Sequence, residues 1–284
     1  MPKSSPLISV GMPIYNAGEY LRPAVLSIIN QSYLNWELII IDDGSTDNSL
    51  EHIQDILDPR IKIINDGLNK GLAARLNEII DLGRGVYFAR MDQDDLSYPD
   101  RFSSQVKLLK SDPSIDLVGV RVLTFTSKNN PIGYLPFFCK HQEITSKPWL
   151  GIYLPHPTWM GKMSWFRERR YASPAPTLCE DQELLLRCYR DSKYATVDQV
   201  LFAYRLRDVV PLKKLLITRW ALFKVQFNFF IKRMRFTDLL FSLLSLLLKV
   251  MRDIMGISYP PAILDNKTVT DFKMILELNS SRVR

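Results

Sequence analysis

Short apolar runs and amphipathic stretches alternate along the N-terminal part of the chain, and this alternation constrains the fold most. The runs that we expect to be buried strands are Leu7–Met12, Glu37–Ile41, Ile61–Ile64 and Val86–Arg90. Apolar residues recur at helical spacing between them, in Tyr20–Gln31, Asn48–Leu57 and Gly71–Leu82. Strand–helix repeats with short loops predict parallel strands joined by right-handed crossovers. We therefore expect an α/β fold with a Rossmann-like, mostly parallel sheet and flanking helices.

The middle of the chain is less regular. Two further helices and two further strands are predicted, at Arg101–Leu109, Glu180–Tyr189, Leu117–Phe125 and Val197–Tyr204. Between them, residues 129–158 hold five prolines and read as loops. From Pro211 the sequence changes to long, basic, aromatic helices, so we predict a catalytic domain over residues 1–210 and a helical region over residues 211–284.

Composition excludes several classes of protein. Hydrophobic residues make up 46% of the chain and charged residues 24%, as in ordinary globular proteins. The three cysteines have no CxxC spacing, no zinc motif is present, and no signal peptide is predicted, so we expect a cytoplasmic protein. Residues 209–237 carry seven Lys and Arg and no acid, which equals the formal net charge of +7. The rest is near neutral, so no nucleic-acid partner is expected.

Three acidic clusters mark where function would lie. Asp42-Asp43 and Asp92-Gln93-Asp94 each follow a predicted strand, and Glu180-Asp181 opens a predicted helix. Strand ends are where open α/β sheets place their ligands. Carboxylates gathered at one place repel one another, unless a cation or a reacting hydroxyl uses them.

The Asp92-Gln93-Asp94 triplet has the spacing of a metal site. Residues two apart on an extended segment point to the same side, so both carboxylates could face one hard cation. A solvated turn with a helix cap is the alternative. For Asp43 the alternative is a turn with an N-cap, and for Asp181 it is an ordinary acid at a helix N-terminus, where the helix dipole would lower its pKa.

Several ordered segments resemble the family 2 glycosyltransferases, the large inverting group with the GT-A fold. The matching segments are residues 8–16, 27–33, 36–47, 69–73 with Asn77, 92–95, 99–101, 156–158 and 180–184. The resemblance implies a nucleotide-diphosphate sugar as donor, Mg²⁺ or Mn²⁺ as cofactor, and a glycan or lipid-linked acceptor in cell-surface polysaccharide synthesis.

The resemblance also implies roles for single residues. Asp181 would be the catalytic base, Asp94 would bind the metal with Asp92 near it, and Tyr15 would lie against the base of the nucleotide. Further residues implied at the nucleotide sugar are Pro13, Asp42, Asp43, Asn69, Lys70, Gly71, Asp92, Glu180 and Arg205. Many relatives carry a histidine shortly after the position of Arg205. Here Leu206-Arg207-Asp208 follows, which leaves open whether Arg205 or Arg207 contacts the diphosphate.

Other functions remain possible at this stage. A nucleotidyltransferase would be expected to carry a Gly-rich basic loop after the first strand, which this chain lacks, and no P-loop motif is present. An inactive nucleotide-sugar-binding module at a membrane is a second alternative. The acceptor is expected to bind within residues 129–175, where aromatic residues could stack on sugars or belong to the core. These are Trp149, Tyr153, Trp159, Trp165 and Phe166.

The basic C-terminal region carries an apolar stripe at spacings of three and four, formed by Leu216, Trp220, Phe223, Phe227, Phe230 and Met234. The uncharged run Leu239–Leu248 follows, too short to span a bilayer. An apolar stripe surrounded by Lys and Arg predicts helices lying on an anionic membrane surface, on the inner face of the cell membrane. Packing against the catalytic domain or in a homodimer is the alternative.

Overall fold

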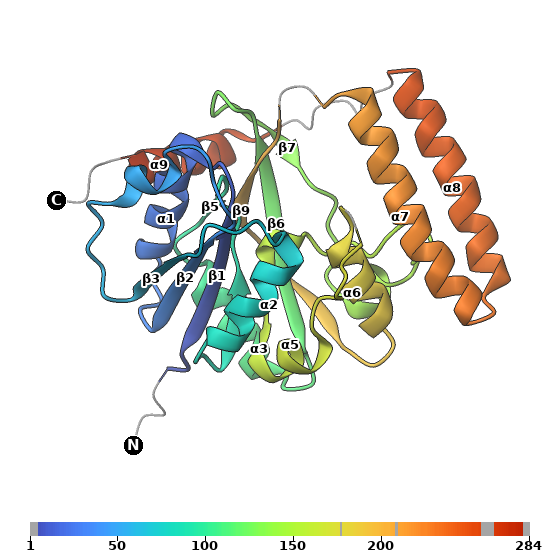
Figure 1. The fold of residues 1–284 in the computed structure, drawn as a ribbon, viewed down its shortest axis with the longest axis horizontal. Coiled ribbons are helices and arrows are strands. Elements are labelled where there is room, and N and C mark those ends of the chain that lie inside the picture. The colour runs from blue at the N-terminus through green and yellow to red at the C-terminus, as the bar shows by residue number, and fades with distance from the viewer. Residues whose placement is uncertain (1–4, 177, 208–209, 257–263, 281–284) are drawn as a thin grey trace.

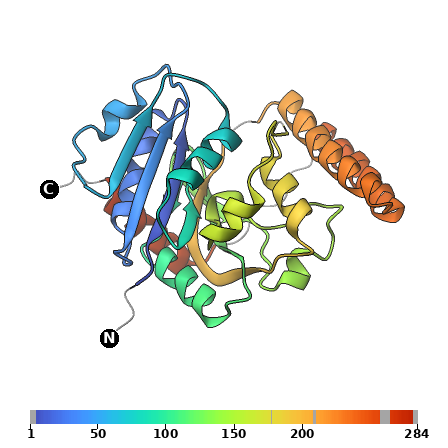
Figure 2. The same ribbon diagram turned by 60° about the horizontal axis from the view of Figure 1, so that its bottom comes forward.

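A twisted sheet forms the centre of the protein, with helices on both faces (Figures 1 and 2). The structure is a computed structural model, and it describes residues 5–176, 178–207, 210–256 and 264–280. Within these residues the sheet has nine strands, in the order β3-β2-β1-β4-β8-β6-β9-β5, with β7 paired to β6. β1 pairs in parallel with β2 and β4, β2 with β3, and β6 with β9, whereas β8 is antiparallel to both β4 and β6. The predicted mostly parallel α/β sheet is confirmed.

The strands are β1 (Ile8–Ile14), β2 (Trp36–Asp42), β3 (Ile61–Asn65), β4 (Tyr87–Arg90), β5 (Leu96–Ser97), β6 (Leu117–Phe125), β7 (Pro131–Tyr134), β8 (Met160–Lys162) and β9 (Tyr194–Arg205). The α-helices are α1 (Leu21–Ile29), α2 (Leu72–Leu82), α3 (Arg101–Ser111), α4 (His141–Ile144), α5 (Met163–Arg169), α6 (Glu180–Cys188), α7 (Leu212–Lys232), α8 (Phe236–Ile254) and α9 (Asn266–Ser280). Short 3₁₀ helices lie at Gly18–Tyr20, Ser49–Ile53 and His156–Thr158.

Side chains of β1 and β2 contribute to core layers on both faces of the sheet. Successive side chains of a strand point to opposite faces. Val10 and Leu38 therefore pack with α1 and α3 on one face, while Ile39 and Ile41 pack with α2 on the other. All four side chains are buried, which explains why both strands read as continuous apolar runs.

The predicted helix at Asn48–Leu57 is wrong, because this segment is only a 3₁₀ helix at Ser49–Ile53. The hydroxyl of Ser49 accepts hydrogen bonds from the backbone N–H groups of Ala17 and Gly18, at 2.8 and 2.9 Å. These bonds hold the start of the segment against the loop after β1. Pro59 disfavours helical geometry at Asp58, so the segment cannot extend as a helix toward β3.

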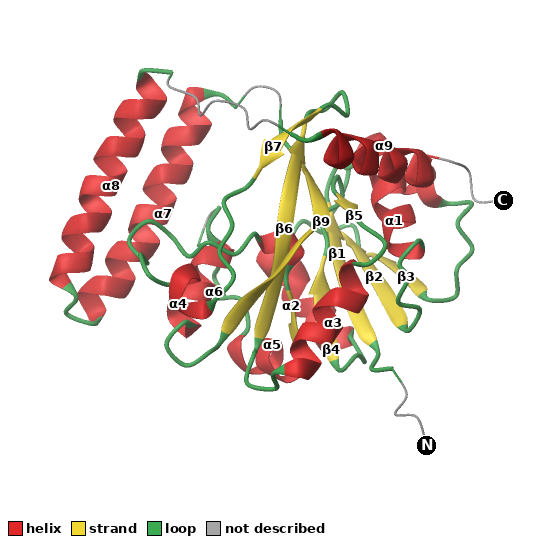
Figure 3. Cartoon of the chain, turned by 180° about the vertical axis from the view of Figure 1, so that it is seen from behind, coloured by secondary structure: helices red, strands yellow, loops and turns green. Residues whose placement is uncertain are grey.

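The segment after residue 210 divides into two parts. α7 and α8 form an antiparallel hairpin at one side of the molecule, whereas α9 returns to lie along α1 (Figures 1 and 3). Phe272 of α9 is fully buried in the core under α1, and the Asn30 amide donates to Asn279 Oδ1 at 3.0 Å. Among the described residues no helix is long and apolar enough to cross a membrane. The boundary near residue 210 stays a proposal, and any truncation that tests it has to spare α9.

Candidate functional site

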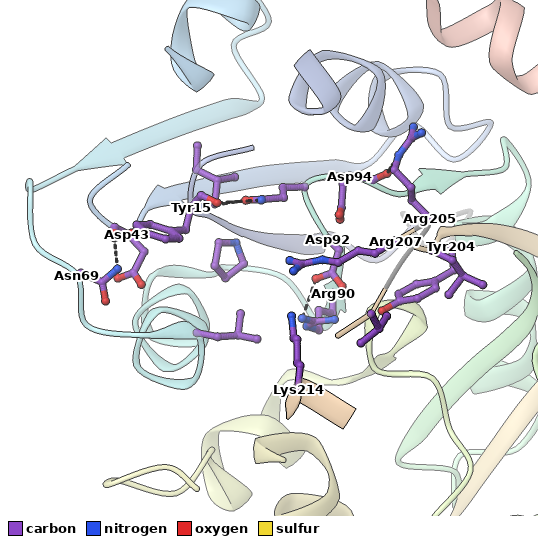
Figure 4. A pocket seen from close by; sticks show the side chains of 16 residues that line it. Tyr15, Asp43, Asn69, Arg90, Asp92, Asp94, Tyr204, Arg205, Arg207 and Lys214 are labelled. Atoms are coloured by element: carbon purple, nitrogen blue, oxygen red, sulfur yellow. Dashed lines mark hydrogen bonds and ion pairs between the residues drawn. The ribbon is translucent and has the colours of Figure 1, made fainter. Parts of the chain in front are cut away.

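The carboxyl ends of β1, β2 and β4 meet at one edge of the sheet. Register pairs Ile14 with Asp42 and Gly11 with Arg90, so the loops that follow these strands start side by side. A cavity of about 830 Å³ opens there (Figure 4). It is lined by Pro13, Ile14, Tyr15, Asp43, Asn69, Leu72, Arg90, Asp92, Gln93, Asp94, Tyr204, Arg205, Leu206, Arg207, Val210 and Lys214. We call this cavity the strand-end cavity.

Asp43 organises one wall of the strand-end cavity. Its carboxylate accepts hydrogen bonds from the backbone N–H of Lys70 at 2.7 Å, from the backbone N–H of Gly71 at 3.0 Å, and from Arg75 Nε at 2.8 Å. Arg75 is fully buried and also pairs with Asp66 at 2.6 Å. A positive φ of 87° at Gly71 lets the chain turn around this carboxylate. The Asp43 carboxylate is thus fixed in place and still reaches the cavity.

The strand-end cavity is not lined by Asp42, Lys70 or Gly71, although the sequence predicts all three at the nucleotide sugar. Asp42 is buried, and its carboxylate accepts from Ser45 N at 2.9 Å and from Asn65 Nδ2 at 3.1 Å. Of the two carboxylates left open by the sequence, Asp43 is the one at the cavity. The Lys70 ammonium pairs with Asp66 at 2.9 Å, and the backbone N–H groups of Lys70 and Gly71 hold the Asp43 carboxylate in place.

Gln93, the middle residue of the acidic triplet, holds Tyr15. Its side-chain oxygen accepts from Tyr15 N at 2.6 Å, and its amide nitrogen donates to Tyr15 O at 3.0 Å. The Tyr15 ring is 48% exposed and borders the strand-end cavity (Figure 4). The paired bonds tie the loop after β1 to the loop after β4.

Asp94 has the surroundings of a cation ligand. Burial, and then repulsion from Asp92, raise the pKa of Asp94 to about 6. Both carboxylates line the strand-end cavity, and oxygen atoms are the ligands that Mg²⁺ and Mn²⁺ prefer. In the described part of the chain no three His, Cys, Asp or Glu side chains are grouped to hold a metal by themselves. The fit is therefore to a cation that takes its remaining ligands from a bound diphosphate and water.

Arg205 and Arg207 occupy different environments. Arg205 donates from Nε to the backbone oxygen of Asp94 at 2.9 Å and from NH1 to Asn129 Oδ1 at 2.9 Å, and it stacks on Tyr20 at 4.3 Å from the ring centroid. Its backbone N–H donates to the buried carboxylate of Asp95 at 2.8 Å. Arg207 is exposed at the cavity mouth. Arg205 thus holds the acidic loop, and Arg207 is the more exposed of the two arginines.

Arg90 was not identified from the sequence, where it ends an apolar strand. It is 3% exposed and pairs with Asp92 at 2.7 Å. Its Nε and NH1 atoms have no hydrogen-bond partner among the described residues. Its charge also favours the ionised forms of Glu180 and Asp181. Arg90 thus lies between the strand-end cavity and the third acidic cluster.

Asp181 lines a second cavity, of about 840 Å³. This cavity is lined by Leu135, Pro136, Leu150–Pro155, Leu178, Cys179, Asp181, Gln182, Thr218, Arg219, Leu222, Ser245, Leu248, Lys249 and Arg252. We call it the hairpin cavity, because α7 and α8 form one of its walls. Glu180 lines neither cavity; its Oε1 lies 3.8 Å from Nδ1 of the buried His156.

Burial dominates the electrostatics of this third cluster. The sequence predicts a lowered pKa for a carboxylate at the start of α6. This prediction is wrong, since burial raises the pKa of Asp181 despite its bond from Gln182 and the charge of Arg90. Burial and the neighbouring Asp181 likewise raise the pKa of Glu180. A carboxylate with a raised pKa is a better proton acceptor near neutral pH than an exposed one.

The five aromatic residues considered for stacking on sugars lie in different environments. Trp159, Trp165 and Phe166 are buried in the core around α2 and α6. Trp149 packs at the edge of this core and faces Phe241 of α8, with 5.2 Å between ring centroids. Tyr153 is 41% exposed and lines the hairpin cavity, so it is the one of the five in position to contact an acceptor there.

Comparison with known proteins assigns the family. The profile described as Glycosyl transferase family 2 matches residues 9–170, which is more than half of the chain. The chain belongs to glycosyl transferase family 2. EpsE of Bacillus subtilis is 43% identical over 129 residues, a match that covers 43% of this chain and 45% of EpsE.

Two further comparisons bear on the fold and on the relatives. The Escherichia coli protein WfgD, a UDP-Glc:alpha-D-GlcNAc-diphosphoundecaprenol beta-1,3-glucosyltransferase, is 32% identical over 103 residues, covering 36% of this chain and 41% of WfgD. The chain therefore matches less than half the length of EpsE and of WfgD. The mannosyltransferase PcManGT of Pyrobaculum calidifontis, solved with GDP-Man and Mn²⁺, aligns with a TM-score of 0.60 over 98% of this chain and 87% of its own, at 16% identity. This likeness establishes the GT-A fold.

Proposed function

We propose that this protein is an inverting glycosyltransferase that moves a sugar from a nucleotide-diphosphate donor to an acceptor hydroxyl, with Mg²⁺ or Mn²⁺ as cofactor. One observation carries the proposal. Two carboxylates, Asp92 and Asp94, line a cavity at the end of β4, while Asp181 lines the neighbouring cavity. Arg90, which pairs with Asp92 and favours the ionised form of Asp181, links the two.

The strand-end cavity would hold the donor. Tyr15 would lie against the base, and the fixed carboxylate of Asp43 would accept hydrogen bonds from the base or ribose, with Asn69 and Pro13 beside it. Asp94 and Asp92 would hold the cation, which neutralises the charge of the departing diphosphate. Arg207 and Lys214, both at the cavity wall, would add positive charge on the diphosphate side.

Asp181 would supply the one proton transfer that the reaction needs. The acceptor hydroxyl is a weak nucleophile and loses its proton while it attacks the sugar carbon. Asp181 takes that proton, the bond from the sugar carbon to the diphosphate oxygen breaks, and the diphosphate departs with the bonding electrons. Attack from the face opposite the leaving group inverts the configuration at the sugar carbon.

The α7–α8 hairpin supports a place at a membrane. Part of its contact with the rest of the protein is polar: Gln226 is 2% exposed and donates to the backbone oxygens of Pro148 and Trp149 at 3.1 and 2.9 Å. Val225, Phe229 and Phe230 of α7 add apolar contacts with the core. Ser242 and Ser245 of α8 are buried as well. The large apolar side chains of α8 point outward instead, at 41–66% exposure. These are Leu240, Phe241, Leu243, Leu244, Leu247, Leu248, Met251 and Ile254.

The charge of the hairpin supports an anionic surface as the partner of this outward face. Lys213, Lys224, Lys232 and Arg233 of the hairpin are exposed, and a basic surface around apolar side chains suits an anionic lipid layer. The stripe expected on α7 is divided: Phe230 is buried in the core, while Trp220 and Phe227 are 51% and 42% exposed. We propose that the hairpin lies on the inner face of the cell membrane and that the acceptor is lipid-linked, as the name of WfgD states for that relative.

A donor screen tests the proposed function. Thermal unfolding of the full chain is followed with UDP-, GDP- and dTDP-sugars, each with Mn²⁺ and with EDTA. The proposal expects at least one nucleotide sugar to raise the Tm only when Mn²⁺ is present, and to release its nucleoside diphosphate when an acceptor is added. Absence of any metal-dependent shift across the panel would contradict it.

A further inference from the structure

The hairpin cavity holds a group of cations that the donor chemistry does not use. Arg219 of α7 and Lys249 and Arg252 of α8 line the same cavity as Asp181. Asp253 pairs with two of them: Arg219 Nε lies 2.9 Å from Asp253 Oδ2, and Arg252 NH2 lies 3.4 Å from Asp253 Oδ1. Three cationic side chains thus gather at this wall of the cavity.

Lys249 is the member of the group with the least counter-charge. Its ammonium donates to the backbone oxygen of Leu150 at 3.0 Å, a neutral acceptor. Burial, and then repulsion from Arg219 and Arg252, lower the pKa of Lys249 to about 8. An anion placed among these side chains would relieve the repulsion and restore the stability of the charged lysine.

Apolar side chains join this cation group to the outward face of the hairpin. Leu178 and Leu222 line the cavity, and so does Leu248, which is 66% exposed and belongs to the apolar row of α8. The cavity therefore combines a carboxylate, a cation group and an apolar surface. A sugar joined through phosphate to a hydrocarbon chain combines the complementary groups: a hydroxyl, an anion and an apolar tail.

We infer that the hairpin cavity is the acceptor site and binds a lipid-linked sugar through its phosphate, held by Lys249 with Arg219 and Arg252. The inference rests on the proposed function, which makes Asp181 the base. It adds the place where the lipid-linked acceptor binds and the residues that hold its phosphate. No bond to the phosphate forms or breaks, because the phosphate only positions the sugar hydroxyl at Asp181.

The test measures binding of a phosphate-bearing isoprenoid to the full chain. Farnesyl diphosphate and farnesol are titrated in EDTA, so that no metal can draw the diphosphate into the strand-end cavity. Wild-type protein should bind farnesyl diphosphate at least ~10-fold more tightly than farnesol, and Lys249→Met should weaken that binding ~10–100-fold. Lys249→Arg should restore most of it, which separates loss of charge from loss of fold.

Two matched controls separate this site from other sources of charge. Lys224→Met removes one exposed positive charge from α7 outside the cavity, and Lys232→Met does the same at the end of α7. Both should bind farnesyl diphosphate as the wild type does. Equal affinity of wild type and Lys249→Met would overturn the inference, and so would an equal loss in Lys224→Met.

Phosphatidylglycerol vesicles distinguish the lipid-linked phosphate from a bulk headgroup. If Lys249→Met lost vesicle binding but kept farnesyl diphosphate, the cations would serve the membrane surface and the inference would fall. Binding of a nucleotide sugar with Mn²⁺ is measured on the same variants. If the protein binds the nucleotide sugar but not farnesyl diphosphate, only the acceptor assignment is wrong. If the wild type does not bind the nucleotide sugar, the proposed function is wrong instead.

Discussion

The strand-end cavity and the α7–α8 hairpin distribute polar and apolar groups in opposite ways. At the sheet edge, polar side chains face the cavity and are fixed by dense hydrogen bonding, as the three donors to Asp43 show. In the hairpin, Ser242 and Gln226 are buried while Leu247 and Leu248 face outward. Each arrangement suits the partner proposed for it: a charged nucleotide sugar in one case, and a hydrocarbon surface in the other.

The contrast between the two regions bears on the exposed apolar side chains of α8. Single exposed apolar residues are normal on a protein surface, but a contiguous apolar row marks an interaction site. The apolar row is not exposed because α8 lacks contact with the core. One side of α8 is buried, and that side carries serines. The hairpin is thus built to present leucines, as the sheet edge is built to present carboxylates.

Loss of the base should produce the largest effect. Asp181→Asn keeps the shape of the side chain but cannot accept the acceptor proton, so transfer should fall by ~10²–10⁴-fold. Asp191→Asn, at an exposed acid just after α6, is the matched control and should transfer normally. Steady-state kinetics with saturating donor measures both, and unchanged transfer by Asp181→Asn would assign the base elsewhere.

The two arginines at the end of β9 should respond differently to truncation. Arg207→Ala should weaken nucleotide-sugar binding ~10-fold with an unchanged Tm, because the exposed guanidinium has a role only toward the ligand. Arg205→Ala removes the bonds to Asp94 O and Asn129, and should lower the free energy of unfolding by about 2–4 kcal/mol. Calorimetric titration and denaturant unfolding separate the two effects, and the opposite pattern would reverse the assignment.

Charges placed on the outward face should detach the hairpin from lipid. Leu240 and Leu247 are 56% and 52% exposed, so changing both to Glu should leave the fold intact. Binding to anionic liposomes should fall ~10-fold or more, since the apolar contact is lost and negative charge is added. Leu57→Glu is the control, because Leu57 is 90% exposed and lies far from the hairpin in the sequence. Flotation with anionic liposomes measures this binding. A shift of the variant from dimer to monomer without any change in flotation would instead identify a second subunit as the partner.

The pH dependence of transfer should show a smaller effect. Asp181 must be deprotonated to act, and burial raises its pKa above the ordinary value of about 3.9. The rate should therefore fall on the acid side with a midpoint above that value. The same raised pKa means that the charged form costs stability at neutral pH, and this cost decreases as pH falls below the folded pKa and is gone below the unfolded pKa. Asp181→Asn should accordingly be no less stable than the wild type at pH 7.

The strands and the donor motifs could be predicted because their signals are local. β6 was placed at Leu117–Phe125, as observed, since its apolar run is bounded by turn residues. The Asp92-Gln93-Asp94 triplet was found from its spacing, and it lines the cavity. Residues 129–158 read as loops, although β7 and α4 lie within them, because both elements have only four residues and depend on tertiary contacts.

Features that depend on three-dimensional placement could not be predicted. Arg90 carries no local signal, and only the approach of α6 to β4 gives its charge a role at Asp181. The direction of the Asp181 pKa shift was missed, since burial is a property of the folded chain. The outward direction of the α8 leucines was missed too, because periodicity defines the faces of a helix without saying which of them is covered.

We propose that donor binding and proton transfer lie in separate cavities of one site. Binding of a nucleotide sugar with Mn²⁺ to Asp94→Asn and Asp181→Asn tests this separation. Calorimetric titration should show metal-dependent binding lost, by ~10-fold or more, in Asp94→Asn, and kept within about 2-fold of wild type in Asp181→Asn. Equal loss of donor affinity in both variants, or normal metal-dependent binding by Asp94→Asn, would contradict the account.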